Sequence, residues 1–166
     1  MRRYWLTPSA FQSDSVSIEG DAFHHIFGVC RQEKGSKFEV LGLEGKAWLV
    51  EVVELGKKSA RAEKIEERQI PPLPKPHIVL ALSIPRFHVM DSVVERAVEM
   101  GVQRILPFFS DFSFVRKGSS LPDSKMDRWR KIIVSATQQC GRGDLMPLLD
   151  PRTFDQLQKD FLNPGT

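Results

Sequence analysis

A cluster of four prolines in the middle of the chain constrains the fold more than any other feature. Between residues 71 and 76 the sequence reads Pro-Pro-Leu-Pro-Lys-Pro. Proline lacks a backbone N–H and has a fixed φ, so neither a helix nor a central strand continues through such a segment. We therefore expect an extended linker at 71–76 that separates an N-terminal part, 1–70, from a C-terminal part, 77–166.

The N-terminal part has the spacing of a small β structure. Short strands are predicted at 37–41, 47–53 and 59–65, and glycines between them supply the turns. A small β-barrel is the expected closure, because the edges of a sheet have to be paired or covered.

The segment after Asp21 departs from this pattern and predicts a helix that Asp21 caps. Its apolar residues fall on one face at helical spacing, namely Phe23, Ile26, Phe27 and Cys30. His24 and Arg31 are seven residues apart, so the same spacing places both on one flank of this helix.

After the prolines the apolar period changes from that of strands to that of helices. The expected elements are a buried parallel strand at 77–82, a helix ending before Gly101, a strand at 104–108, a helix at 125–139 and a last helix that Thr153 caps and that runs to Leu162. In the two long helices, Met100 and Cys140 are assigned to the apolar faces. This alternation predicts a parallel α/β sheet with right-handed crossovers.

Composition and motifs exclude several classes of protein. The apolar runs are too short for a membrane span and the N-terminus lacks an apolar signal core, so we expect a cytoplasmic protein. Cys30 and Cys140 are far apart and lack zinc-ligand spacing, so both are interpreted as reduced, packed thiols. No nucleophile elbow, phosphate loop, dinucleotide fingerprint or histidine pair for a metal is present.

Positive charge is concentrated in one part of the chain. The net charge is only +3, and residues 1–70 carry 11 Lys and Arg against 11 Asp and Glu. Residues 112–143 carry 7 against 2. Such a run is either a solvated helix face or a surface for nucleic acid, and the charge alone leaves both open.

Polar residues at helix ends are the remaining candidates for chemistry. Arg142 follows the second long helix, and Gln138 and Gln139 precede it by one turn. Arginine suits a phosphate or a base edge, and a glutamine amide both donates to and accepts from a nucleobase. Glu99 stands near the C-terminus of the first long helix, where the helix dipole disfavours an acid. Loop capping is the alternative for all of them.

Several motifs in a fixed order resemble one known family. They are Arg2-Arg3-Tyr4-Trp5, the segment His24 to Arg31, Arg96-Ala97-Val98-Glu99-Met100-Gly101-Val102 with Arg104-Ile105-Leu106-Pro107 after it, Arg128-Trp129-Arg130-Lys131-Ile132, and Ala136 to Arg142. In this order they resemble the small-subunit rRNA methyltransferase E family, which methylates uridine N3 in 16S rRNA and belongs to the trefoil-knotted SPOUT class.

The resemblance implies an α+β protein with a PUA-like β-barrel for RNA binding at 1–70 and a SPOUT-type domain, lacking its knot, at 77–166. It implies S-adenosylmethionine as cofactor, 16S rRNA or the small ribosomal subunit as partner, and a homodimer when complete. The expected RNA-binding residues are Arg2, Arg3, His24, Arg31, Lys34 and Arg128. The candidates for the active site are Glu99, Gln139 and Arg142.

The chain departs from the family at three places. Phe112 stands where the family has arginine, and Gln138 replaces a glutamate. The Gly-Pro-Glu-Gly-Gly turn and the Leu-Gly-x-x-Ile-Leu-Arg segment that hold the cofactor in the family are missing before Thr166. We therefore expect a truncated form in which this chain supplies no cofactor-binding residue and is inactive by itself.

Two alternatives follow from the missing knot. The first is a non-enzymatic RNA-binding protein, and reading the gene beyond codon 166 distinguishes it, because an in-frame Gly-Pro-Glu-Gly-Gly supports the enzyme. The second is that neither half contacts RNA. In that case, changing Arg31 and Arg142 to alanine leaves the affinity for rRNA fragments unchanged.

The departures give a first prediction. The 166-residue chain is expected to give no binding heat with S-adenosylmethionine in titration calorimetry, because the segments that hold the cofactor in the family are not part of it. A heat signal with micromolar affinity would contradict this.

Overall fold

The computed structural model describes residues 1–43, 45–111, 113–115 and 121–162. Phe112 therefore lies outside the described residues. The chain forms two compact units, of which the first contains Met1–Pro72 with Thr137–Asp144 and the second contains Leu73–Ala136 with the chain from Leu145. No helix in the described part of the chain is both long and apolar enough to cross a membrane.

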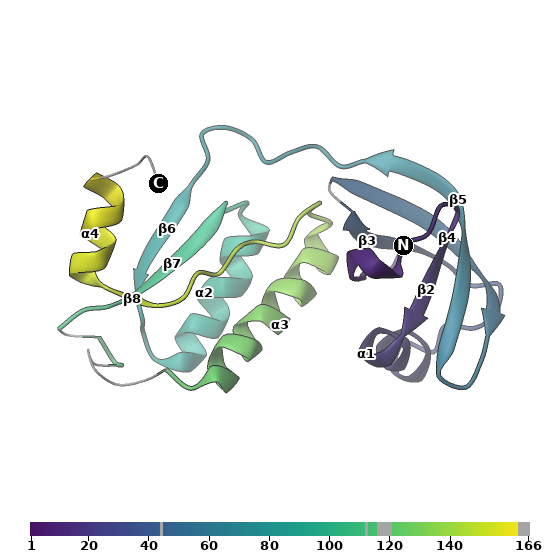
Figure 1. Cartoon of the computed structure of the whole chain (residues 1–166), viewed down its shortest axis with the longest axis horizontal. Coiled ribbons are helices and arrows are strands. Elements are labelled where there is room, and N and C mark those ends of the chain that lie inside the picture. Colours follow the sequence, from purple (N-terminus) through teal and green to yellow (C-terminus); the bar gives the residue numbers. More distant parts are fainter. Residues whose placement is uncertain (44, 112, 116–120, 163–166) are drawn as a thin grey trace. The chain divides into compact units, whose positions relative to one another are not determined.

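The first unit is built on a curled five-stranded sheet, a half-barrel (Figure 1). Its strands are β1 Arg3–Trp5, β2 Ser15–Glu19, β3 Lys37–Leu43, β4 Lys46–Leu55 and β5 Ser59–Gln69, in the order β1-β3-β4-β5-β2. The predicted strands are thus confirmed and extended. The sequence prediction missed β1 and β2, which form the two edges.

Bulges and one glycine support the curl. The pairing of β3 with β4 shifts register between Leu41 and Leu43, and such a shift bends a strand and increases its twist. Gly42 lies in this shift with φ +143°, and a Cβ there would overlap the Leu6 carbonyl oxygen. Only glycine lets the chain after β1 approach β3 this closely.

The inner face of the curled sheet is apolar. Fully buried residues from four of its strands form this core, namely Val16, Ile18, Phe38, Val40, Val50 and Ala62. Tyr4 packs edge-on against Phe38, with ring centroids 5.0 Å apart.

The helix after Asp21 differs from the prediction. A short α1, Gly20–Phe23, begins before Asp21, which lies in its first turn, and the N-cap position is Glu19. The chain continues as a π-helix, His24–Val29, and Arg31 follows it with φ +52°. The α-helix from which the common flank of His24 and Arg31 was derived is wrong, because the segment is a π-helix with a longer period and Arg31 lies outside it. The common flank itself stays a prediction.

The second unit is a parallel sheet with helices. The strands β6 Val79–Ser83, β7 Arg104–Phe109 and β8 Arg152–Thr153 pair in that order, and both pairings are parallel. The helices are α2 Phe87–Glu99, α3 Asp123–Cys140 and α4 Phe154–Leu162. Figure 1 shows α2 and α3 on one side of β6 and β7 and α4 on the other. The predicted fold class, a small β-barrel followed by an α/β parallel sheet, is confirmed, with the N-terminal sheet curled into a half-barrel.

Some details of this unit depart from the predictions. Met100 and Cys140 were assigned to apolar helix faces, but Met100 is 80% exposed and Cys140 is exposed too. Both lie at the C-terminal end of a helix, where the apolar face of the helix no longer packs against the core. The first strand begins at Val79 rather than His77 and is only half-buried, because it forms an edge of the described sheet.

The predicted cap of the last helix is confirmed. The Thr153 hydroxyl accepts from the Gln156 N–H at 3.3 Å, and the Gln156 side chain accepts from the Thr153 N–H at 2.9 Å. This reciprocal pair is a capping box, and it satisfies two backbone donors at the start of α4.

One carboxylate joins the two long helices. Asp91 on α2 accepts from the indole N–H of Trp129 at 3.0 Å and from the Arg128 Nε at 2.9 Å, both on α3. Trp129 is fully buried, so its N–H depends on Asp91 for a partner.

Replacing Asp91 by alanine is therefore expected to lower the free energy of unfolding by about 1–3 kcal/mol, because a buried indole donor loses its acceptor. Asp91→Asn keeps an acceptor and is expected to cost less. Urea denaturation measures both, with Glu95→Ala as the control, since Glu95 is exposed on the same helix. Equal stabilities for Asp91→Ala and Glu95→Ala would contradict this assignment.

Candidate functional site

Three serine hydroxyls meet where β6 and β7 end. Ser83 closes β6, and Ser110 directly follows β7. The Ser83 Oγ lies 2.9 Å from both the Ser110 Oγ and the Ser113 Oγ, and the Ser110 N–H donates to the Ser113 Oγ at 2.6 Å. Since parallel strands place their carboxyl ends at one edge, this edge is where ligands bind in open α/β sheets.

A pocket of about 430 Å³ opens beside these hydroxyls. Aromatic, hydroxyl and carboxylate groups line it, from Ser83, Phe108, Phe109, Ser110, Asp111, Phe154 and Asp155. The rings of Phe108 and Phe154 lie 5.7 Å apart, and Phe154 remains 49% exposed. The pocket therefore offers an accessible ring beside groups that form hydrogen bonds.

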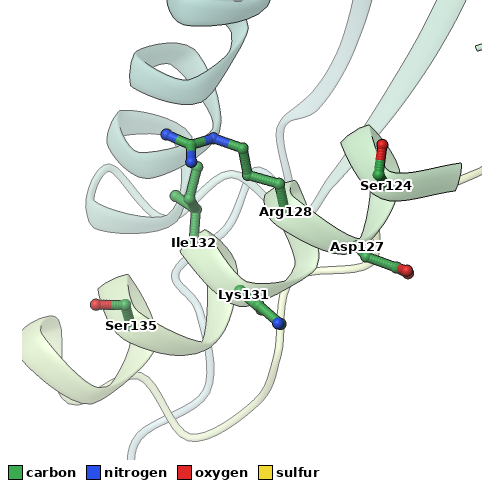
Figure 2. A pocket seen from close by; sticks show the side chains of 6 residues that line it. All are labelled: Ser124, Asp127, Arg128, Lys131, Ile132 and Ser135. Carbon is green, nitrogen blue, oxygen red and sulfur yellow. The ribbon is translucent and has the colours of Figure 1, made fainter. Parts of the chain in front are cut away.

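A second concavity, of about 630 Å³, runs along α3 (Figure 2). Its lining follows the helix, as Figure 2 shows, with Ser124, Asp127, Arg128, Lys131, Ile132 and Ser135. Ser124, Arg128, Lys131 and Ser135 recur at intervals of three or four residues, so four donors follow one another along one stripe of the helix. We call these four residues the α3 donor stripe.

The arginines of this helix are partly neutralised. Arg128 binds Asp91, and Arg130 lies 3.1 Å from Asp127. Lys131 is exposed on the stripe. It is therefore the lysine on this surface best placed for a phosphate.

The predicted RNA-binding residues of the N-terminal part lie on the first unit. Arg2 donates to the Cys30 carbonyl oxygen at 2.9 Å, which brings it beside Arg31. His24, Arg31 and Lys34 are exposed, so all three side chains are accessible to a partner.

Arg3 is held by a carboxylate. Its Nε donates to Glu39 at 2.7 Å, and Arg68 donates to both oxygens of the same carboxylate at 2.7 and 3.0 Å. Glu39 is 8% exposed. The hydrogen bonds from Arg68 and then Arg3 lower its pKa from 4.5 to about 2, although burial opposes them.

The three predicted active-site residues are not gathered in one place within either unit. Glu99 belongs to the second unit and binds Arg96 at 3.0 Å. Arg128 of that unit is bound to Asp91, eight residues earlier on α2, or about 12 Å along the helix axis. Glu99 and Arg128 therefore lie well apart.

Gln139 and Arg142 belong to the first unit. Gln139 is exposed, whereas the Arg142 side chain is only 4% exposed and binds both oxygens of Asp144, at 2.9 and 3.1 Å. Gln138 accepts from the Trp5 N–H at 3.2 Å. Arg142 and Gln138 thus have structural contacts here, and the roles expected from the resemblance stay predictions.

Sequence reasoning missed the serine cluster and its aromatic neighbours. A signal was present, because Ser83 follows the first predicted parallel strand and Ser110 follows the second. Applying the rule for carboxyl ends of parallel strands would have placed them together. The position of Phe154 required the structure.

Neither pocket fits a whole S-adenosylmethionine. The cofactor carries a carboxylate, an ammonium, a sulfonium and a flat adenine, whereas the pocket at the strand ends has two carboxylates that suit the cations and, among its described lining residues, no cation for the carboxylate. The α3 concavity has cations but no aromatic ring in its described lining. We therefore derive no step through the cofactor from these residues.

Comparison with known proteins identifies the family. A model of the RNA methyltransferase domain matches residues 71–164, and one of the RNA methyltransferase PUA domain matches 18–65. The chain belongs to the RNA methyltransferase domain family.

Individual relatives agree with this membership. The chain is 25% identical over 165 residues to ribosomal RNA small subunit methyltransferase E of Synechocystis, covering 99% of this chain and 52% of that protein. It is 32% identical over 140 residues to the protein of the same name from Aquifex aeolicus, covering 84% and 58%. The chain thus spans little more than half the length of these relatives.

A solved structure agrees with the fold. The crystal structure of a ribosomal RNA small subunit methyltransferase E from Neisseria gonorrhoeae, bound to S-adenosyl methionine, superposes with a TM-score of 0.82 at 26% identity. The match covers 95% of this chain and 64% of that one. The resemblance stated from the motifs is confirmed.

The Glu39 cluster gives a prediction with a defined pH window. Because the folded-state pKa is depressed from 4.5 to about 2, the carboxylate stabilises the fold fully above pH 4.5 and loses this contribution as the pH falls toward 2. The contribution is at most about 3 kcal/mol. Glu39→Gln is expected to lower the free energy of unfolding at pH 7, and the gap from the unmodified protein should narrow between pH 4.5 and 2.

Denaturant unfolding at several pH values measures this gap. Glu51→Gln is the matched control, because Glu51 lies on the neighbouring β4 in an exposed pair with Lys37 and should cost under about 0.5 kcal/mol. If the difference in free energy of unfolding between Glu39→Gln and the unmodified protein stays constant with pH, the ionised Glu39 carboxylate is not the source of the stability.

Proposed function

We propose that the protein methylates N3 of a uridine in small-subunit 16S rRNA, with S-adenosylmethionine as methyl donor. The observation that carries the proposal is the match of the RNA methyltransferase domain to residues 71–164. The relatives named ribosomal RNA small subunit methyltransferase E support the rRNA substrate. A cytoplasmic location fits such a substrate.

The proposed RNA surface has two parts. Residues 1–70 would act as a PUA-like RNA-binding domain, through the exposed side chains of His24, Arg31 and Lys34 and through Arg2 beside them. Residues 77–166, after the linker, would contribute the α3 donor stripe. Its donors recur about once per helical turn of 5.4 Å, a spacing that suits successive phosphates of an RNA strand.

Phosphate contacts would fix the register of the RNA without reading its sequence. Arg128 is positioned for this role by Asp91, which holds its Nε, and its two terminal nitrogens form no hydrogen bond to another described residue and would be available to a phosphate. Glu99, Gln139 and Arg142 are retained as candidates for orienting the target nucleotide, and the protein is proposed to be a homodimer when complete.

The proposal is tested by methyl transfer. The protein expressed from its complete open reading frame is incubated with S-adenosylmethionine and small ribosomal subunits that lack uridine N3 methylation. Mass spectrometry of the digested rRNA is expected to find N3-methyluridine. RNA binding without any methylated nucleoside would instead favour a non-enzymatic RNA-binding protein.

The contribution of the α3 donor stripe is measured separately, by RNA binding. Lys131→Ala is expected to weaken binding of an rRNA fragment and to reduce the slope of log affinity against log salt by about one, because one phosphate contact is lost. Arg130→Ala is the matched control, since Arg130 lies on the same helix but does not line the concavity and binds Asp127. Equal slopes for both variants would remove the α3 donor stripe from the interface.

A further inference from the structure

We propose that the pocket at the carboxyl ends of β6 and β7 binds a uracil base turned out of its RNA strand. This rests on the proposed function and assigns a place to the base that the protein would methylate. A base that undergoes chemistry has to leave its stack, and the enzyme must offer it a surface in exchange. The pocket, of about 430 Å³, has room for a pyrimidine nucleotide.

Phe154 supplies the surface for stacking. It is 49% exposed although it is a large apolar side chain, and it lines the pocket together with Phe108 and Phe109. Stacking of a base on an aromatic ring contributes about 1–3 kcal/mol in single-strand binding proteins. An exposed ring inside a pocket is therefore the element from which a flipped base gains the stacking that it has lost.

The polar lining matches the edge of uracil. That edge presents an acceptor, a donor and an acceptor, namely O4, N3–H and O2. The pocket offers the Ser83 and Ser110 hydroxyls, which hydrogen-bond to each other and to Ser113 and would donate to the base in exchange for these bonds, and the Asp111 carboxylate as an acceptor. In the proposed complex Asp111 accepts from the N3–H, which is the proton that must leave before N3 gains a methyl group.

The same lining discriminates against cytosine. Cytosine has a lone pair at N3, so a carboxylate facing this atom gains no hydrogen bond and meets an acceptor instead. Discrimination of this kind is strong where a polar group would otherwise remain without a partner.

Charge distinguishes the base from other ligands. Asp111 and Asp155 line the pocket, and among its described lining residues there is no lysine or arginine. A phosphate would be repelled there, whereas a neutral base is not. In this arrangement phosphates bind at the cationic stripe on α3 and the base binds at the strand ends.

Photochemical crosslinking with the full chain tests the proposal. The probe is a short oligouridylate with one 5-iodouridine, and the crosslinked residue is mapped by mass spectrometry. We expect the crosslink at Phe154, its loss in Phe154→Ala and its recovery in Phe154→Trp, which restores an aromatic face. Phe114→Ala is the matched control, because Phe114 is an exposed phenylalanine of the same unit that does not line the pocket.

Base preference is the second readout. An oligocytidylate carrying 5-iodocytidine at the same position is expected to crosslink more weakly, and Asp111→Asn should reduce the preference for uridine about tenfold, as expected for the loss of one charged hydrogen bond. Circular dichroism confirms that each variant is folded.

Three outcomes would overturn the proposal. Crosslinks that map only to α3 or to the first unit would show that the base binds elsewhere. An unchanged uridine preference in Asp111→Asn would remove the assigned hydrogen bond. Competition by S-adenosylmethionine alone would make the cofactor the occupant.

The test separates this proposal from the proposed function. Methylation of rRNA without a crosslink at Phe154 leaves the function standing and refutes the pocket. A uridine-specific crosslink at Phe154 without methylation by the complete protein supports the base pocket and refutes the proposed methyltransferase function.

Discussion

The parallel pairing of β6 with β7 is the constraint on which the second unit depends. Its register places Ser83 opposite Phe108, so the two strands end at the same level. The serine cluster, the aromatic pocket and the turn toward α2 all begin from this common edge. In an antiparallel pair the end of one strand would adjoin the start of the other, and Ser83 and Ser110 would lie at opposite ends of the strand pair.

Carboxylates determine which cations remain available for RNA. Glu39 binds Arg3 and Arg68, and Asp91 binds Arg128. These arginines gain fixed positions but lose part of their net charge. Lys131 and Arg31 are exposed at their positions. A count of basic residues therefore overstates the surface that an RNA meets, and the partner of each cation decides its role.

Local patterns were sufficient to predict most of the fold. Met90, Val94 and Val98 recur at helical spacing and are buried as expected, Gly101 has the left-handed conformation expected after α2, and Thr153 caps α4. The errors arise where tertiary structure overrides local preference. The π-helix at His24–Val29 has no signature in an apolar pattern read at 100° per residue, and β1 is too short for alternation to identify. β2 does alternate, with Val16 and Ile18 buried, and this signal was missed.

The candidate site was harder to predict, for a physical reason. Ser83, Ser110 and Phe154 are separated by 27 and 44 residues in sequence, and only strand pairing brings them together. Arg142 has the residue type and location of an active-site group, yet the fold buries it against Asp144. Sequence spacing can suggest a functional residue, but whether it is accessible depends on contacts that form between distant segments.

The capping box at Thr153 has a consequence for how the pocket can change. Phe154 is the first residue of α4, and the hydrogen bonds between Thr153 and Gln156 fix the backbone on either side of it, while its ring is half exposed. Substitution at 154 therefore alters the shape and chemistry of the pocket wall at little expense to folding. The position is therefore suited to altered ligand preference on an unchanged scaffold.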